Sequence, residues 1–153
     1  MVLRNPILAE CWPRAGKTLT VPLVPLESGR KGVASLTVTE ADLATAFGSG
    51  DVAVLATPRL VALTEEATMA AVAADLDPGS TTVGMRVHID HLKPSALGAN
   101  VEATALLERV DGRRLTFAVE VTGEGAVVAQ GQVIRVLVDT ERFLERLQPN
   151  EGT

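Results

Sequence analysis

The spacing of apolar and polar residues changes from a helical period to a strand period near the middle of the chain. Residues 57–76, TPRLVALTEEATMAAVAADL, repeat apolar side chains at steps of three and four, which is typical of a helix. The helix is expected to begin at Thr57-Pro58, because threonine can cap a free N–H and proline fits the first turn. It is expected to end before Asp77-Pro78-Gly79. Its many small residues suit burial inside a curved sheet.

After that helix, four segments alternate apolar and polar side chains with the period of two that indicates β-strands. They are residues 82–91, 101–107, 115–121 and 127–138. In the first segment one face is expected to carry Val83, Met85, Val87, Ile89 and His91, and the other Thr82, Gly84, Arg86, His88 and Asp90. The pair Asp111-Gly112 is a hairpin signal between the second and third segments.

Shorter elements are predicted on either side of this core. A strand is expected at 33–38, a short helical segment at 40–47, and an amphipathic helix at 140–147. Proline and glycine break up the first 30 residues.

The resulting order is one strand, a central helix and four consecutive antiparallel strands. That order matches an α+β hotdog fold, in which an antiparallel sheet wraps around a long central helix; the alternative is another α+β sandwich with the helix on one face of an open sheet. We expect residues 31–148 to form this single domain, with an N-terminal arm at 1–30 and a disordered tail at 149–153. A domain of this size with a free sheet edge is expected to form a homodimer.

Composition and charge narrow the class of protein. Of the 153 residues, 46% are hydrophobic and 22% charged, which indicates a folded domain. The formal net charge of -5 argues against nonspecific binding to nucleic acid or to an anionic membrane, since both need a basic surface. Because no apolar run is long enough for a membrane span or a signal-peptide core, a cytoplasmic location is expected. With one cysteine, Cys11, and two histidines, we predict neither an internal disulfide nor a metal site.

One carboxylate interrupts the apolar pattern of the central helix. Glu65 falls on the stripe that Val61, Met69 and Val72 define, where a carboxylate is costly unless it is paired or used. The alternative is a helix rotated so that Glu65 is solvated beside Glu66.

Two further polar residues are candidates for chemistry. His91 has the apolar parity of its strand, where a neutral imidazole near a carboxylate can relay protons; the alternative is a strand-end histidine satisfied in the core. Thr57 is either only a helix cap or a hydroxyl at the positive end of the helix dipole. Thr57 and Glu65 are separated by about 12 Å of regular helix. Either the first turn is irregular or a second subunit brings the two residues together.

Signatures of several other enzyme classes are missing from the sequence. It contains no GxSxG elbow, no GxGxxG or phosphate loop, and no calcium-loop pattern. The basic pair Arg113-Arg114 beside the predicted hairpin is either a solvated hairpin end or a contact for the nucleotide phosphates of a CoA ligand.

Residues 33–138 resemble the hotdog-fold acyl-CoA thioesterases of the fluoroacetyl-CoA thioesterase type. Members of that family carry a threonine at the head of the central helix, a glutamate eight positions later and a histidine twenty-six positions after that. Thr57, Glu65 and His91 match both spacings without a gap. The run Leu76–Gly84 and the hairpin Val110–Leu115 are also similar.

The resemblance implies hydrolysis of the thioester of a small or medium acyl-CoA, with no cofactor, because CoA is part of the substrate. Glu65 would act as the base for water or as the attacking carboxylate, and His91 would shuttle the proton and assist the leaving thiolate. Thr57 would position water or the carboxylate, or hold the carbonyl. Gly84 would let the thioester approach the strand backbone closely.

The segment before Thr57, FGSGDVAVLA, differs from the fluoroacetyl-specific members, which place aromatic lid residues there. Fluoroacetyl specificity is therefore not predicted. The alternatives to a thioesterase are a non-catalytic protein of the same fold that binds acyl-CoA or another small ligand, and a hotdog hydratase or dehydratase. The Asp-x-Asn-Pro-x-His pattern that the hydratase class resembles is missing from the sequence.

Overall fold

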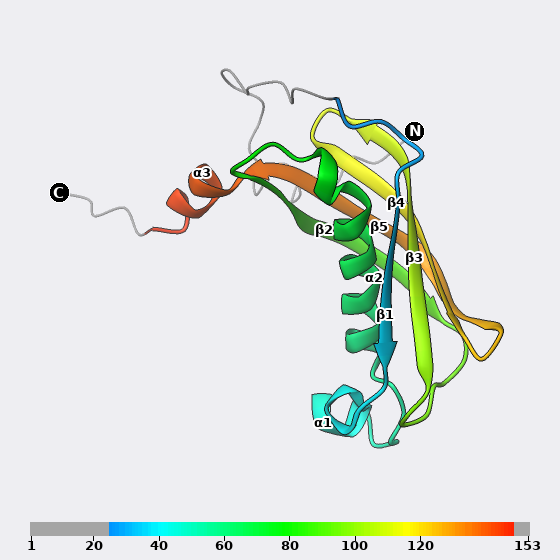
Figure 1. Ribbon diagram of the computed structural model, residues 1–153. Coiled ribbons are helices and arrows are strands. Elements are labelled where there is room, and N and C mark those ends of the chain that lie inside the picture. The colour runs from blue at the N-terminus through cyan, green and yellow to red at the C-terminus, as the bar shows by residue number, and fades with distance from the viewer. Residues whose placement is uncertain (1–24, 149–153) are drawn as a thin grey trace, which may run out of the picture.

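The computed structural model describes residues 25–148, in which a curled antiparallel sheet wraps around the helix α2 (Thr57–Val72) (Figure 1). The strands are β1 (Lys31–Thr37), β2 (Ser80–His91), β3 (Asn100–Asp111), β4 (Arg114–Gly123) and β5 (Ala126–Asp139). The shorter helices are η2 (Glu40–Asp42), α1 (Ala44–Phe47), η3 (Ala73–Asp75) and α3 (Thr140–Glu145). The predicted elements and the α+β class are confirmed. Residues 1–24 of the predicted arm, with Cys11, and the predicted tail 149–153 lie outside the described residues.

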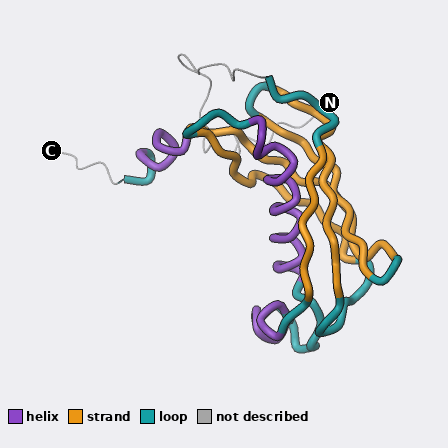
Figure 2. The backbone as a smooth tube through the Cα atoms, viewed as in Figure 1, coloured by secondary structure: helices purple, strands orange, loops and turns teal. Residues whose placement is uncertain are grey.

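The strand order in the sheet is β1-β3-β4-β5-β2, and every neighbouring pair is antiparallel. Figure 2 shows the strands in orange beside the purple central helix. The prediction that the four later strands follow one another across the sheet is wrong for β2, which pairs with β5 and not with β3. The connection 92–99 contains Pro94 and is too long for a tight hairpin turn, so the chain passes around the end of the sheet. β2 is therefore an edge strand of the described sheet.

The buried face of α2 differs from the predicted stripe. It consists of Leu60, Leu63, Thr64, Ala67, Thr68, Ala71 and Val72. Val61 and Glu65 are half-buried and Met69 is 49% exposed, because the helix is turned so that the neighbouring row faces β1 and β3. Of the predicted stripe, only Val72 lies in the core.

Small residues bring α2 very close to β1. A Cβ atom at Gly32 of β1 would collide with the backbone of Ala67 and Ala71 of α2. The alanine-rich sequence of the helix is thus explained by contact between two backbones, which larger side chains would separate.

A β-bulge changes which side chains of β2 face the helix. The register with β5 shifts between Gly84 and Arg86, so that Thr82 and Gly84 share the inner face with Ile89 and His91. The extra residue reverses the alternation, as bulges do. The prediction that Gly84 points away from His91 is therefore wrong.

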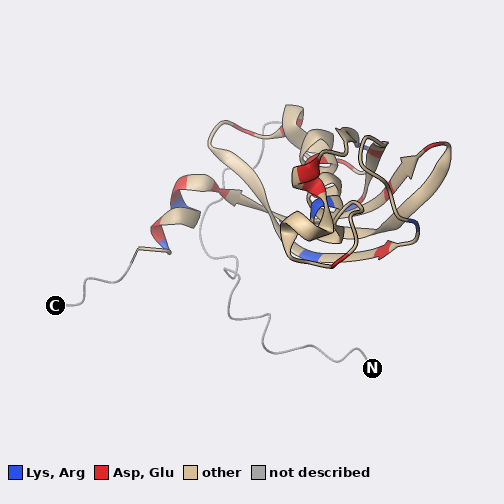
Figure 3. Cartoon of the chain, turned by 90° about the horizontal axis from the view of Figure 1, so that it is seen from below, with Lys and Arg blue, Asp and Glu red and all other residues tan. Residues whose placement is uncertain are grey.

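The C-terminal helix α3 extends away from the sheet (Figure 1). Asp139 caps it by accepting a hydrogen bond from the backbone N–H of Arg142 at 2.9 Å. Leu144 and Leu147 are 54% and 71% exposed, so these two residues of the predicted amphipathic helix are not packed against the described domain. In Figure 3, basic positions are interspersed with acidic ones on this helix. None of the helices in residues 25–148 is long and apolar enough to cross a membrane.

Candidate active site

The hydroxyl of Thr57 and the ring of His91 meet where α2 begins and β2 ends. Thr57 Oγ1 lies 2.8 Å from His91 Nδ1. The N-cap of α2 is Ala56, which offers no side-chain cap, and Thr57 is already inside the helix. The prediction that Thr57 caps the helix is therefore wrong. With the ring proton on Nδ1, His91 donates a hydrogen bond to the hydroxyl oxygen of Thr57, and Nε2 is left to accept a proton.

His91 is partly removed from water. Burial lowers the pKa of His91 below the ordinary value of 6.5, while the backbone of Lys93 acts in the opposite direction. A lowered pKa keeps the imidazole neutral at neutral pH, in the form that accepts protons. His91 Nε2 is buried and has no hydrogen-bond partner within residues 25–148. One ring nitrogen thus remains for a group supplied from outside.

A second polar cluster joins Glu65 of α2 to Arg135 of β5. Arg135 Nη1 lies 3.1 Å from Glu65 Oε1, while Arg135 Nε and Nη2 donate to the side chain and the backbone carbonyl of Thr82, each at 2.8 Å. Arg135 is only 5% exposed. Burial lowers the pKa of Arg135 and the neighbouring Glu65 raises it. Bonds to Thr82 fix the guanidinium, so it holds the carboxylate in one orientation.

Gly84 completes this second cluster. A Cβ atom at Gly84 would collide with Glu65 Oε1. The missing side chain lets the backbone of β2 lie directly against the carboxylate, close to the guanidinium of Arg135. Glu65 itself remains 33% exposed, so a molecule from solvent can reach it.

Sequence reasoning missed Arg135. Arg135 alternates along the strand with Val133 and Leu137, which places it on the inner face of the sheet. This position could have indicated a site, because a charged side chain inside a core strand needs a partner. The run GQVIRVLVD carries this one arginine among apolar residues.

The two clusters lie apart within one chain. α2 is regular from Thr57 onward, so eight residues separate Thr57 from Glu65 by about 12 Å. Seven residues of β2 separate Gly84 from His91 by about 23 Å. The alternative of an irregular first helical turn is therefore wrong. No hydrogen bond joins Glu65 to His91 in the described chain.

The basic pair lies at the same end of the sheet as the second cluster. Arg114 is in register with Val136 of β5, one row from the row that contains Gly84 and Arg135. Arg113 is half-buried and accepts a backbone hydrogen bond from Leu137 through its carbonyl. The contact of Arg113 and Arg114 with phosphate stays a prediction.

Within the described ranges no group of three His, Cys, Asp or Glu side chains is arranged to hold a metal ion.

Comparisons with known proteins support the same architecture. Residues 38–141 match the family model described as fluoroacetyl-CoA-specific thioesterase. The fluoroacetyl-CoA thioesterase of Streptantibioticus cattleyicolor is 32% identical over 90 residues, which are 59% of this chain and 65% of that relative. The chain thus matches slightly less than two thirds of the relative's length.

Two solved structures show how far the fold is shared. A mutant of the thioesterase FlK in complex with fluoroacetate and CoA has a TM-score of 0.72 and 25% identity, covering 77% of this chain and 99% of FlK. A hot-dog-like protein from Thermanaerovibrio acidaminovorans has a TM-score of 0.73 and 23% identity, covering 82% of this chain and 93% of that one. The predicted hotdog fold is confirmed.

Proposed function

The chain belongs to the fluoroacetyl-CoA-specific thioesterase family, and from this membership we propose that it hydrolyses the thioester of a small or medium acyl-CoA. The observation that carries the proposal is the contact between the Thr57 hydroxyl and His91 Nδ1. It pairs a hydroxyl with a neutral imidazole where α2 begins and β2 ends. No cofactor is needed, since CoA belongs to the substrate. A cytoplasmic location, where acyl-CoA is made and used, is part of the same proposal.

The complete site is proposed to form between two copies of the chain. β2 is an edge strand of the described sheet; its own Val87 is 37% exposed, and Met69 of α2 is 49% exposed. Antiparallel pairing of two β2 edges about a two-fold axis reverses one strand relative to the other. If the axis passes between Val87 and His88, Gly84 of one copy lies opposite His91 of the other. The two clusters would then face one another across the dimer.

The division of chemistry follows from what each cluster can do. Arg135 occupies one oxygen of Glu65, and the other can accept a proton from the attacking water. A new bond forms between the water oxygen and the acyl carbon, the carbon–sulfur bond breaks, and the CoA thiolate leaves. His91, carrying the proton that Glu65 has taken up, protonates the thiolate, while Thr57 fixes the orientation of the ring. Direct attack by the Glu65 carboxylate, giving an anhydride, is the alternative route.

A panel of acyl-CoA esters of increasing length, with detection of the free thiol, tests the proposal. We expect hydrolysis by the wild type and a loss of about 10²- to 10⁴-fold in kcat for Glu65→Gln and His91→Ala. The exposed neighbour Glu66 supplies a matched control, and Glu66→Gln should keep the wild-type rate. Thermal stabilisation by the esters without turnover would instead support the non-catalytic binding protein. Equal rates in wild type and both site variants would contradict the mechanism.

A further inference from the structure

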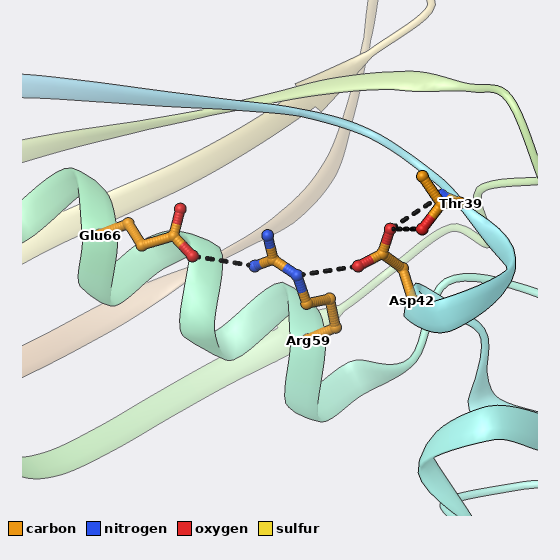
Figure 4. A network of polar contacts seen from close by, with 4 residues as sticks. All are labelled: Thr39, Asp42, Arg59 and Glu66. Atoms are coloured by element: carbon orange, nitrogen blue, oxygen red, sulfur yellow. Dashed lines mark hydrogen bonds and ion pairs between the residues drawn. The ribbon is translucent and has the colours of Figure 1, made fainter.

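A network of charged side chains fastens the start of α2 to η2, the short helix that precedes α1 (Figure 4). Arg59 Nε lies 3.0 Å from Asp42 Oδ1, and Arg59 Nη1 lies 3.0 Å from Glu66 Oε1. Asp42 Oδ2 accepts hydrogen bonds from the backbone N–H and the hydroxyl of Thr39, at 2.8 and 2.7 Å. These bonds link η2 to the first and third turns of the central helix.

The network compensates for a weak helix start. Ala56 provides no side-chain cap, and the first turn of α2 has no acidic residue. Asp42 supplies both missing elements from another part of the chain. Its carbonyl accepts the N–H of Ala56 at 2.8 Å, and its carboxylate binds Arg59. The hydrogen bonds from Thr39 and the charge of Arg59 lower the pKa of Asp42, so the carboxylate stays charged.

Thr57 lies between these two anchor points. Ala56 precedes it and Arg59 follows two positions later, and both are bound to Asp42. His91 is anchored separately by the pairing of β2 with β5, where it is in register with Ala129. The short contact between Thr57 and His91 therefore depends on two independently fixed supports, one of which is the Asp42–Arg59 pair.

We propose that Asp42 and Arg59 form a positioning pair that holds the Thr57 hydroxyl against His91. Its consequence for catalysis rests on the proposed thioester hydrolysis, but its effect on the geometry does not. The pair differs from an ordinary surface ion pair. The side chains of Asp42 and Arg59 are 12% and 19% exposed, so removal of Arg59 leaves the largely buried Asp42 carboxylate without its ion pair, and removal of Asp42 leaves Arg59 only the exposed Glu66.

Glu66 offers a matched control. It binds the same guanidinium at the same distance, but its side chain is 50% exposed and it bonds neither Thr39 nor Ala56. An exposed pair of this kind contributes little to structure. Loss of Glu66 should therefore leave Thr57 in place, whereas loss of Asp42 or Arg59 should release it.

The hydrogen bond between Thr57 and His91 Nδ1 can be measured without substrate, by the ¹⁵N chemical shifts of the imidazole ring in the full chain. Thr57→Val gives the value for the broken contact. We expect Asp42→Asn and Arg59→Met to move the Nδ1 shift most of the way toward that value. Glu66→Gln should retain the wild-type shift, and Arg59→Lys, which keeps the charge, should recover part of it.

Two results would overturn the positioning pair. One is a wild-type Nδ1 shift in Asp42→Asn and Arg59→Met while Thr57→Val moves it. The other is loss of folding in both variants, seen in amide spectra, which would make the pair a requirement for folding rather than a positioning device. Asp42→Asn keeps an oxygen that can accept both Thr39 bonds, so it is the milder variant.

Kinetics add a second readout if the chain hydrolyses acyl-CoA. We expect kcat to fall about 10- to 100-fold in Asp42→Asn with KM nearly unchanged, because a small displacement of a catalytic group affects the reaction more than binding. If no acyl-CoA is hydrolysed, the proposed function fails, and the Nδ1 shifts still decide whether the pair positions Thr57.

Discussion

At the scale of single residues, the molecule keeps one imidazole neutral and one carboxylate fixed. His91 is bound by a hydroxyl and partly buried, while Glu65 is bound by a buried guanidinium and partly open to solvent. A neutral base and an oriented carboxylate are what proton transfer around a thioester requires. The residue-level consequences concern pH and the space around the carboxylate.

The lowered pKa of His91 has a defined effect on stability. In the unfolded chain His91 takes up a proton near pH 6.5, whereas the folded chain resists it to lower pH. Between the pKa of His91 in the folded chain and that in the unfolded chain, the unfolded state binds more protons. The free energy of unfolding should therefore fall as the pH drops below about 6.5. Urea unfolding at several pH values measures this, and His91→Gln should flatten that part of the profile.

The same group can be followed directly by NMR titration. In His88→Gln the remaining described histidine is His91, and its apparent pKa should lie below 6.5. On the acid side of the pH profile, kcat/KM should decline at the same pH, because the pH dependence of this ratio reports the pKa values of groups in the free enzyme. A pKa of 6.5 or above would contradict the burial that the structure gives to this ring.

The space beside Glu65 predicts the effect of a single methyl group. In Gly84→Ala the new Cβ would collide with Glu65 Oε1 and push the carboxylate away from Arg135. Because Gly84 is exposed at a sheet edge, we expect little change in Tm but a fall of about 10- to 100-fold in kcat. Gly50→Ala is the control, since its Cβ would make only an ordinary contact with Ala44. Equal kcat in the two variants would mean that Glu65 tolerates displacement.

At the scale of elements, close approach of α2 and β1 positions the helix that carries Thr57 and Glu65. In Gly32→Ala the added Cβ would meet the backbone of Ala67 and Ala71, which cannot move aside like a flexible side chain. We expect a loss of about 1–3 kcal/mol in the free energy of unfolding, measured with urea. The sign is diagnostic, because alanine in place of a strand glycine otherwise stabilises by about 0.5–1 kcal/mol. Lys31→Ala, at the exposed neighbour, should change little.

The elements themselves were predictable because their periodicities are local. The helix beginning at Thr57 and the hairpin at Asp111-Gly112 follow from proline and turn preferences that act within a few residues. The bulge at Gly84 and the pairing of β2 with β5 were not, because they depend on long-range register. The rotation of α2 was missed for a related reason: both candidate faces contain apolar residues, and contact with β1 decides between them.

The candidate site was predictable as residue types and spacings but not as contacts. Thr57, Glu65 and His91 follow from the family resemblance, yet only the structure joins Thr57 to His91 and Glu65 to Arg135. Arg135 lies 70 positions beyond Glu65, where nothing local marks the partnership. The network around Asp42 was equally hidden, since its members come from separate elements.

At the scale of the whole molecule, the central claim is that the two clusters act together across a dimer formed at the edge strand β2. Each copy carries a hydroxyl–imidazole cluster at one end of β2 and a carboxylate–guanidinium cluster at the other, and the proposed pairing of two copies would bring unlike clusters together. The claim predicts that neither cluster is sufficient within its own chain. It also predicts that copies with different defects can repair one another.

Mixed dimers of His91→Ala and Glu65→Gln test this most directly. Each variant alone should be inactive on acyl-CoA, because both sites of its homodimer lack one group. In the mixed dimer one site carries both defects and the other carries none, so a purified mixed dimer should recover about half of the wild-type rate. Mixed dimers that form, as shown by differently tagged subunits, and yet hydrolyse no acyl-CoA would contradict a site shared between two copies.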